Sequence, residues 1–287
     1  MEPGAIGWGM GEPTPSPQPP TPEGDGMAYE TIIVEKSEGV QTITLNRPEV
    51  LNAFNMKMLE ELGDTIADAG RDESVRAVLF KAAGRAFAAG ADLNMVSSLA
   101  VGFGARQRVL NVNKTIVIPL QELEKPVIAA VNGHAAAAGA SLALASDIII
   151  AAESAKFSQV FLKVGLFPDM ASLYFLPRLV GQAKAKKLIL TNETIDAREA
   201  ERIGMISEVV PDEQLIPRAT SLAKQLANGP TKAIGVTKKA MNRSLDVDLA
   251  TLIEIEAYGQ ALCCGSDENQ EGTNAFLEKR APRFHRD

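Results

Sequence analysis

The stretch Lys125–Asp147, KPVIAAVNGHAAAAGASLALASD, combines an apolar strand, a tight turn of very small residues and the start of a helix. Residues Ala86–Leu93, AFAAGADL, show the same pattern earlier in the chain. Small residues leave backbone N–H groups bare and let a ligand approach the main chain closely. Two such turns in one domain predict two N–H donors aimed at a single oxygen, an arrangement that stabilises an enolate or a tetrahedral adduct.

Composition excludes several classes of function. The chain has 287 residues and a net charge of -7, which argues against a general role in binding nucleic acid, since phosphate backbones select basic surfaces. Its two cysteines, Cys263 and Cys264, are adjacent and form no disulfide framework, which indicates a reducing, cytoplasmic compartment. With only His134 and His285 as histidines, we expect no metal site. The apolar run 148–152 is too short to span a bilayer, so we expect no membrane partner.

The chain divides into three zones. Residues 1–26 are rich in proline and glycine and lack apolar periodicity, so we expect a disordered N-terminal extension. Helix and strand signals alternate over 27–215, which predicts an α/β core with a largely parallel sheet. Local patterns predict a hairpin over 31–46, helices over 56–70, 103–116 and 138–145, and strands over 77–80, 126–131 and 148–152. Only helical patterns follow over 216–287, and we expect this region to pack on the core or on other subunits.

The order and spacing of several segments resemble the crotonase (enoyl-CoA hydratase/isomerase) superfamily from Ala28 to about Phe284. These segments are TLNRPEVLNAFN (44–55), AFAAGADL (86–93), the run from 125 to 157, GLFPD (165–169) followed by LPRLVG (176–181), LTNETIDAREAERIGMISEVV (190–210) and AFLEKRAPRF (275–284). The resemblance implies a spiral core of repeated ββα units and a C-terminal helical trimerisation region, with a homotrimer or a dimer of trimers as the assembly. It also implies acyl-CoA substrates, no additional cofactor, and a thioester enolate held by two backbone N–H groups.

The resemblance places the two backbone donors at Ala91 and Ala138. The family usually has glycines where this chain reads Ala137–Ala138–Gly139. A backbone N–H survives the change from glycine to alanine, so an oxyanion hole can persist. The added methyl groups would narrow it, and alanine does not easily adopt a positive φ.

Further residues are expected to contact the substrate because they match places where the family binds CoA or the acyl group. Those near the two turns are Ala53, Phe54, Ala89, Asp92 and Leu93. At the other end of the chain, Phe276 and Lys279 match the aromatic residue and the lysine that a C-terminal helix supplies to CoA.

Family hydratases use two glutamates, and this chain has Ser141 and Phe161 in their places. Neither side chain acts as a general base near neutral pH. We include both among the residues of the acyl site, although Ser141 could equally fill space. Efficient hydration by the two-glutamate route is therefore not expected.

Asp169 falls at a position that some family isomerases use, notably those resembling the ring-opening isomerase of the phenylacetyl-CoA pathway. A 1,3-proton shift needs only one base, so the sequence predicts a Δ3,Δ2-type enoyl-CoA isomerase with Asp169 as general base and acid. A different interpretation makes Asp169 the N-cap of a helix beginning at Met170. Alternative functions are a hydratase, an Asp-dependent thioester hydrolase or dehalogenase, and a CoA-binding homologue without catalysis.

Overall fold

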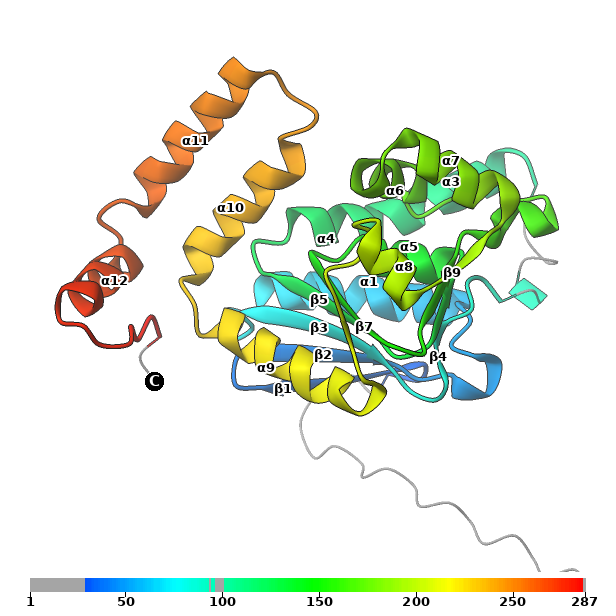
Figure 1. Cartoon of the computed structure of the whole chain (residues 1–287), viewed down its shortest axis with the longest axis horizontal. Coiled ribbons are helices and arrows are strands. Elements are labelled where there is room, and N and C mark those ends of the chain that lie inside the picture. Colours follow the sequence, from blue (N-terminus) through cyan, green and yellow to red (C-terminus); the bar gives the residue numbers. More distant parts are fainter. Residues whose placement is uncertain (1–28, 93, 96–100, 286–287) are drawn as a thin grey trace, which may run out of the picture.

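Two sheets form the centre of this computed structural model, which describes residues 29–92, 94–95 and 101–285 (Figure 1). The expected N-terminal extension, 1–26, lies outside the described residues. The larger sheet has the strand order β1-β2-β3-β5-β7-β10, and the smaller has the order β4-β6-β8-β9. Their bounds are β1 Ile32–Ser37, β2 Val40–Leu45, β3 Ala77–Ala82, β4 Ala86–Ala88, β5 Val127–Val131, β6 His134–Ala136, β7 Ile148–Ala152, β8 Lys156–Ser158, β9 Thr194–Asp196 and β10 Glu208–Val210. Among the described strands, only the pairs β1–β2 and β8–β9 are antiparallel, which confirms the predicted hairpin and the largely parallel sheet.

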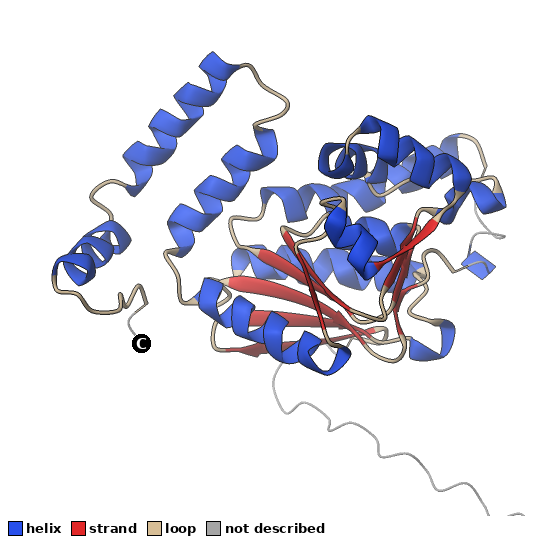
Figure 2. Cartoon of the chain, viewed as in Figure 1, coloured by secondary structure: helices blue, strands red, loops and turns tan. Residues whose placement is uncertain are grey.

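The helices also follow the predicted pattern (Figure 2). They are α1 Met56–Arg71, α3 Phe103–Val112, α4 Ile118–Glu122, α5 Ala138–Leu144, α6 Ser172–Val180, α7 Gln182–Thr191, α8 Ala197–Arg202, α9 Leu215–Ala227, α10 Thr231–Arg243, α11 Leu249–Cys263 and α12 Asp267–Leu277. Short helical turns are η1 Pro48–Val50, the π-helical η2 Asn113–Val117, η3 Val160–Val164 and η4 Asp212–Gln214. The helix expected over 103–116 extends further, because η2 joins α3 to α4 without a break.

The chain alternates between the two sheets. β3, β5 and β7 lie in the larger sheet, and each is followed by a strand of the smaller sheet, β4, β6 or β8. After β4 and β6, helices return the chain to the larger sheet, so the unit is ββα. After β8, α6 and α7 lead first to β9 of the smaller sheet, and α8 then leads to β10. Because β4, β6 and β8 pair in parallel, their carboxyl ends lie along one edge. The two turns of small residues follow β4 and β6, and they therefore meet at this edge.

The hydrophobic core covers both faces of the larger sheet. On one face, α1 buries Leu62 and Ile66 in the same cluster as Phe80 of β3. On the other face, α9 packs small residues such as Ala223 against Leu79. The first of the predicted C-terminal helices is thus a layer of the core, and the part that projects from it begins at α10 (Figure 1).

Several contacts join helix α10 to the core, and two of them are close or buried. A Cβ atom on Gly235 would lie 2.4 Å from the carbonyl oxygen of Glu124, so only glycine permits this approach. Lys238 Nζ lies 2.8 Å from Asp147 Oδ2, and the lysine side chain is only 6% exposed. Asp147 also accepts a hydrogen bond from the N–H of Val127, which fixes the start of two neighbouring strands. Beyond this joint, α11 has no buried residue.

Gly139 lets α5 pack directly against β4. A Cβ atom at this position would lie 2.4 Å from the carbonyl oxygen of Ala88 and 2.6 Å from its Cβ. Both atoms belong to a buried strand residue, so neither can move aside cheaply. The close approach holds the start of α5 beside the turn that follows β4.

Replacing Gly139 by alanine should lower the free energy of unfolding by about 1–3 kcal/mol, because the strand must shift to admit the methyl group. Urea denaturation followed by circular dichroism measures the change. Gly70→Ala is the matched control, since its new Cβ meets only Leu123 Cδ1 at 3.7 Å within a helix. Stability should stay the same or rise slightly in that variant. Equal effects of the two substitutions would contradict the close approach.

Candidate active site

A cavity of about 1090 Å³ lies where the turns after β4, β6 and β8 meet. Residues of α3 and of the start of α6 form its other walls. Eight residues predicted from the sequence line it: Ala53, Phe54, Ala89, Ala91, Asp92, Ala138, Phe161 and Asp169. Segments from four separate parts of the chain therefore converge on one space, as the family resemblance implied.

The structure brings the two predicted backbone donors together. Phe54 forms a parallel β-bridge to Ala91. In this bridge the N–H of Phe54 donates to the carbonyl oxygen of Gly90 at 2.7 Å, and the N–H of Asp92 donates to the carbonyl oxygen of Phe54 at 2.9 Å. The N–H of Ala91 takes part in neither bond. Ala138 is the first residue of α5, where a helical N–H has no acceptor within the helix.

Ala137 has the strained backbone that joins these turns. Its φ of 46° and ψ of -119° lie in a region that favours glycine. The expectation that alanine resists a positive φ thus applies to Ala137, while Ala138 is helical. The N–H of Ala137 donates to the carbonyl oxygen of Ser158 in β8 at 2.9 Å, and a Cβ atom on Gly90 would lie 3.1 Å from the methyl group of Ala137. Such a residue costs of order 1–3 kcal/mol and persists because its surroundings over-determine it.

Asp169 does not cap a helix. Met170 and Ala171 both have positive φ, 48° and 56°, so α6 begins only at Ser172 and has no side-chain cap. The interpretation of Asp169 as the N-cap of a helix at Met170 is therefore wrong. Its Oδ1 atom is buried and has no hydrogen-bond partner among the described residues.

Burial in the apolar cavity raises the pKa of Asp169 to about 6, while the positive charge of Arg108 acts in the opposite direction. The walls around it include Leu166, Phe167 and Leu173. A carboxyl group with this pKa is ionised for much of the time near neutral pH and still retains enough basicity to remove a proton. The raised pKa of Asp169 therefore suits a general base.

Ser141 lies beneath the cavity and is absent from its walls. It is fully buried, and its hydroxyl lies 3.1 Å from the carbonyl oxygen of Ala137 and 3.3 Å from that of Asp169. The backbone uses this hydroxyl, and contact of Ser141 with substrate stays a prediction. Ser141 instead ties the Asp169 turn to the first turn of α5.

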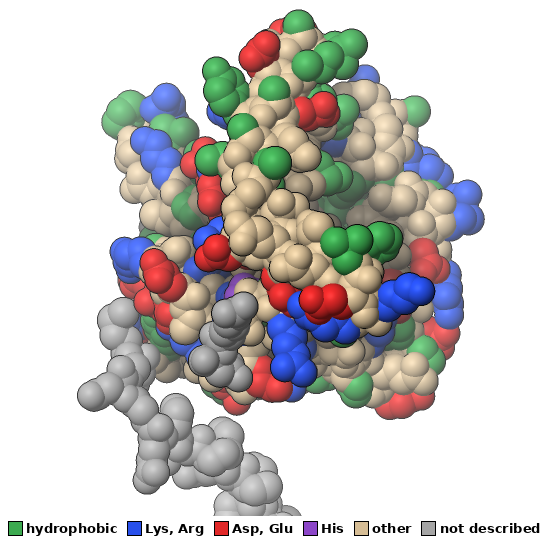
Figure 3. Space-filling view, turned by 90° about the vertical axis from the view of Figure 1, so that its left-hand side faces the viewer, with side chains coloured by type: hydrophobic (Ala, Val, Ile, Leu, Met, Phe, Trp, Pro, Cys, Tyr) green, Lys and Arg blue, Asp and Glu red, His purple; other side chains and the backbone are tan. Residues whose placement is uncertain are grey.

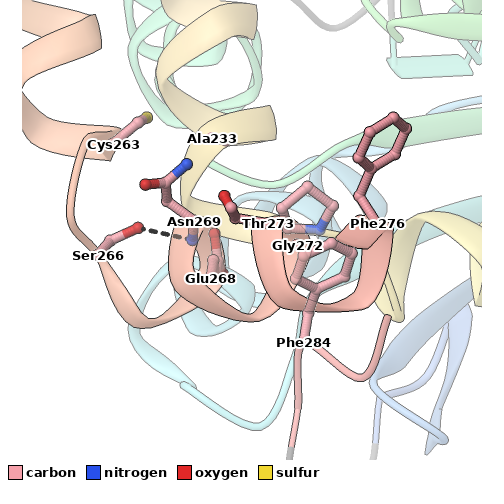
Figure 4. Close-up of a pocket in the computed structure, with 10 residues that line it drawn as sticks. Ala233, Cys263, Ser266, Glu268, Asn269, Gly272, Thr273, Phe276 and Phe284 are labelled. Atoms are coloured by element: carbon pink, nitrogen blue, oxygen red, sulfur yellow. Dashed lines mark hydrogen bonds between the residues drawn. The ribbon is translucent and has the colours of Figure 1, made fainter. Parts of the chain in front are cut away.

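Two predicted CoA contacts lie away from the cavity. Phe276 is 83% exposed at the end of α12, and Lys279 is exposed just after it. Phe276 lines a separate groove of about 430 Å³, with Cys263 at the other end (Figure 4). Within one chain these two residues do not meet the rest of the site, because α10–α12 carry them away from it (Figure 1). Leu93, also predicted, lies outside the described residues.

Sequence reasoning missed two residues that shape the site. Arg47 donates to the carbonyl oxygen of Ala53 at 2.6 Å and pairs with Asp92 at 3.2 Å, which holds the two loops together. Arg108 projects from α3 into the cavity beside Ala105, Val109 and Val112. These four positions have the spacing i, i+3, i+4 and i+7, so a helical projection would have shown the arginine on an otherwise apolar face.

No group of three or more potential metal ligands occurs among the residues that the structure describes. His134, the histidine nearest to the glycine turn, bonds Ser158 Oγ at 2.9 Å and links β6 to β8. Its pKa is lowered by burial and by the nearby charges of Lys156 and Lys163.

Within the described ranges, no helix is long and apolar enough to cross a membrane.

The fold and the converging turns define the class of protein. The chain belongs to the enoyl-CoA hydratase/isomerase family, whose model matches residues 35–287. It is 43% identical over 257 residues to the 1,2-epoxyphenylacetyl-CoA isomerase of Escherichia coli, covering 89% of this chain and 98% of the relative. It is 42% identical over 258 residues to a probable enoyl-CoA hydratase of Rhodobacter capsulatus, covering 90% and 99%.

Solved structures agree with this assignment. A crystal structure of an enoyl-CoA hydratase/isomerase from Cupriavidus metallidurans matches with a TM-score of 0.85 at 32% identity, covering 90% of this chain and 97% of that one. The crotonase-type α/β fold predicted from the sequence is thereby confirmed. Relatives named as isomerases and as hydratases both occur, so the reaction must be argued from the site.

The raised pKa of Asp169 predicts that this residue opposes folding above acid pH. Between about pH 4 and pH 6 the folded protein binds more protons than the unfolded chain, so stability falls as pH rises through this window. Asp169→Asn removes the effect. The variant should match the wild type below about pH 4 and exceed it by roughly 1–3 kcal/mol above about pH 6. Denaturant titrations at several pH values measure this difference.

Asp92→Asn is the control for that experiment. It removes the charge that pairs with Arg47, so it should lower stability at neutral pH. A stability difference between Asp169→Asn and the wild type that does not change with pH would contradict the assigned pKa.

Proposed function

We propose that this protein is an acyl-CoA isomerase that shifts a double bond from the Δ3 to the Δ2 position. The observation that carries the proposal is the carboxyl group of Asp169 in the cavity, whose buried Oδ1 has no hydrogen-bond partner among the described residues and whose pKa is about 6. By resemblance, the two positions that hold glutamates in family hydratases are Ser141 and Phe161 here. One carboxylate without an activated water suits a proton shift better than the addition of water.

The proposed reaction needs one base and one oxyanion site. Asp169 removes a proton from C2 of a 3-enoyl-CoA, and the electron pair moves onto the thioester oxygen as a dienolate. The N–H groups of Ala91 and Ala138 stabilise that oxygen. Asp169 then returns the proton to C4, which forms the 2-enoyl-CoA and restores the carboxylate. The thioester is itself the substrate, so we propose that no additional cofactor takes part.

Replacing Asp169 by asparagine should reduce kcat by at least ~10²-fold, the scale of acid–base catalysis, with little effect on CoA affinity. The assay incubates 3-enoyl-CoA and 2-enoyl-CoA with enzyme in heavy water and follows products by mass. Isomerisation moves the double bond without adding water. Addition of water to 2-enoyl-CoA would favour the hydratase instead, and binding without turnover would favour a non-catalytic homologue. Retained turnover in the variant would exclude Asp169 as the base.

We also propose that the protein acts as a trimer or a dimer of trimers. Large apolar side chains stand at the surface along α10, α11 and the segment between them, as Figure 3 shows for this side of the molecule. They include Met241, Leu245, Leu249, Ile253, Tyr258 and Leu262, each at least 52% exposed. Burial of such a surface between copies would stabilise an assembly. Phe276 and Lys279 could then reach CoA only from a neighbouring copy. The cytoplasmic location stays an expectation.

The double variant Ile253→Asp with Leu262→Asp should dissociate this assembly, because each substitution would place a charge in an apolar interface. Light scattering at micromolar concentration measures the mass. Leu190→Asp on α7 is the control, since that leucine is 66% exposed and lies away from the projecting C-terminal arm, α10–α12. A wild-type protein that is monomeric under these conditions would contradict the proposal.

A further inference from the structure

Arg108 is the one half-buried cation among the described residues that line the cavity. It makes no hydrogen bond or ion pair with any residue that the structure describes. The other charged residues of the walls differ from it. Asp92 is paired with Arg47, whereas Lys163 is exposed and the exposed Arg106 lies over the ring of Phe103 at 5.9 Å. Partial burial of a guanidinium group without a hydrogen-bond partner costs free energy, and a ligand that accepts its hydrogen bonds would offset this cost.

The guanidinium of Arg108 faces the same space as the carboxyl group of Asp169. Its charge is close enough to lower the pKa of that carboxyl against the effect of burial, yet no N–O distance between them is within 4.0 Å. A direct ion pair would hold the carboxyl group in its ionised form and weaken it as a base. The two groups therefore face the same cavity without a direct ion pair, and the acyl chain would occupy that cavity.

An oxygen atom is the partner that fits this position. The guanidinium offers five N–H donors and accepts no hydrogen bond, so only an acceptor can complete it. The phosphates of CoA are less suited, because the acid-base residue Asp169 would lie at the acyl end of the substrate and Arg108 is close enough to act on the pKa of that residue. The remaining walls near Asp169 are apolar, among them Leu166, Phe167 and Leu173.

We propose that Arg108 binds an oxygen atom carried by the acyl group, so that the enzyme selects acyl-CoA thioesters whose acyl group bears a hydrogen-bond-accepting oxygen. This inference rests on the proposed isomerase function, since it assigns the acyl chain to the space beside Asp169. Both a neutral ether or carbonyl oxygen and a carboxylate have the required chemistry. A carboxylate could accept two parallel bonds from the guanidinium fork.

The test compares three substrates of equal chain length: 3-hexenoyl-CoA, 6-methoxy-3-hexenoyl-CoA and 3-hexenedioyl-CoA. The wild type should prefer at least one oxygen-bearing substrate by about 10-fold to 100-fold in kcat/KM, the scale of a hydrogen bond to a charged group. Arg108→Gln should abolish that preference, and Arg108→Lys should restore part of it. Lys114→Gln is the matched control, because it removes a positive charge from the next helical turn at an exposed site outside the cavity. The control should keep the full preference.

The pH profile gives a second measurement on the same variants. Loss of the Arg108 charge should raise the pKa of Asp169, so the acid limb of kcat/KM should move to higher pH even with 3-hexenoyl-CoA. The other charged wall residues, Asp92, Arg106 and Lys163, are unchanged in this variant. A purely structural role for Arg108 would lower activity without this shift.

The outcomes separate the inference from the proposed function. Preference for the dicarboxylic substrate alone identifies a carboxylate as the ligand, and preference for both identifies any acceptor oxygen. Equal use of all three substrates by the wild type, or an equal loss on all three in Arg108→Gln, overturns the role of Arg108. If the wild type isomerises none of them, the proposed function fails, and calorimetric binding of hexanoyl-CoA against adipoyl-CoA still tests Arg108. Equal affinity for those two thioesters would then overturn it.

Discussion

The contact on which the site depends is the close packing of two backbone segments around β4 and β6. Gly139 sits where a Cβ atom would lie 2.4 Å from the carbonyl oxygen of Ala88, and Gly133 sits where one would lie 2.2 Å from that of Arg85. Glycine thus permits contact at both ends of the β4–β6 pair. This approach sets the turn that carries Ala91 beside the start of α5. Any residue that separated the strands would also separate the two backbone donors.

The site is built from features that oppose stability. Ala137 adopts a backbone conformation that favours glycine, and Asp169 has a buried carboxyl oxygen without a partner. Each is compensated nearby: Ala137 donates its N–H to Ser158, and Ser141 lies within hydrogen-bonding distance of the carbonyl oxygens of both segments. The protein therefore holds a strained turn and a poorly solvated acid in place through their backbones. Their side chains stay free to face the cavity.

The core and the C-terminal arm differ in how they are stabilised. Helix α9 buries a row of alanines against the sheet, and α10 is anchored by Gly235 and by the ion pair of Lys238 with Asp147. Beyond that joint α11 lies against α10, yet none of its residues is buried within the chain. A single copy thus completes the cavity walls but leaves the arm without a core of its own. The proposed assembly would supply the missing partner surface.

Local sequence determined the elements and the position of the two small-residue turns. Apolar runs predicted the strands and local patterns predicted α1 and α5, while the family resemblance of the motifs around Ala91, Ala138 and Asp169 implied which segments would converge. Such features depend on neighbours along the chain, so they can be recognised from the sequence.

Tertiary structure decided what those side chains face. Ser141 proved to bind the backbone, Phe276 and Lys279 proved to lie outside the cavity of their own chain, and Arg108 proved to project into it. Solvation and long-range packing set each of these outcomes, and neither is encoded in the spacing of nearby residues.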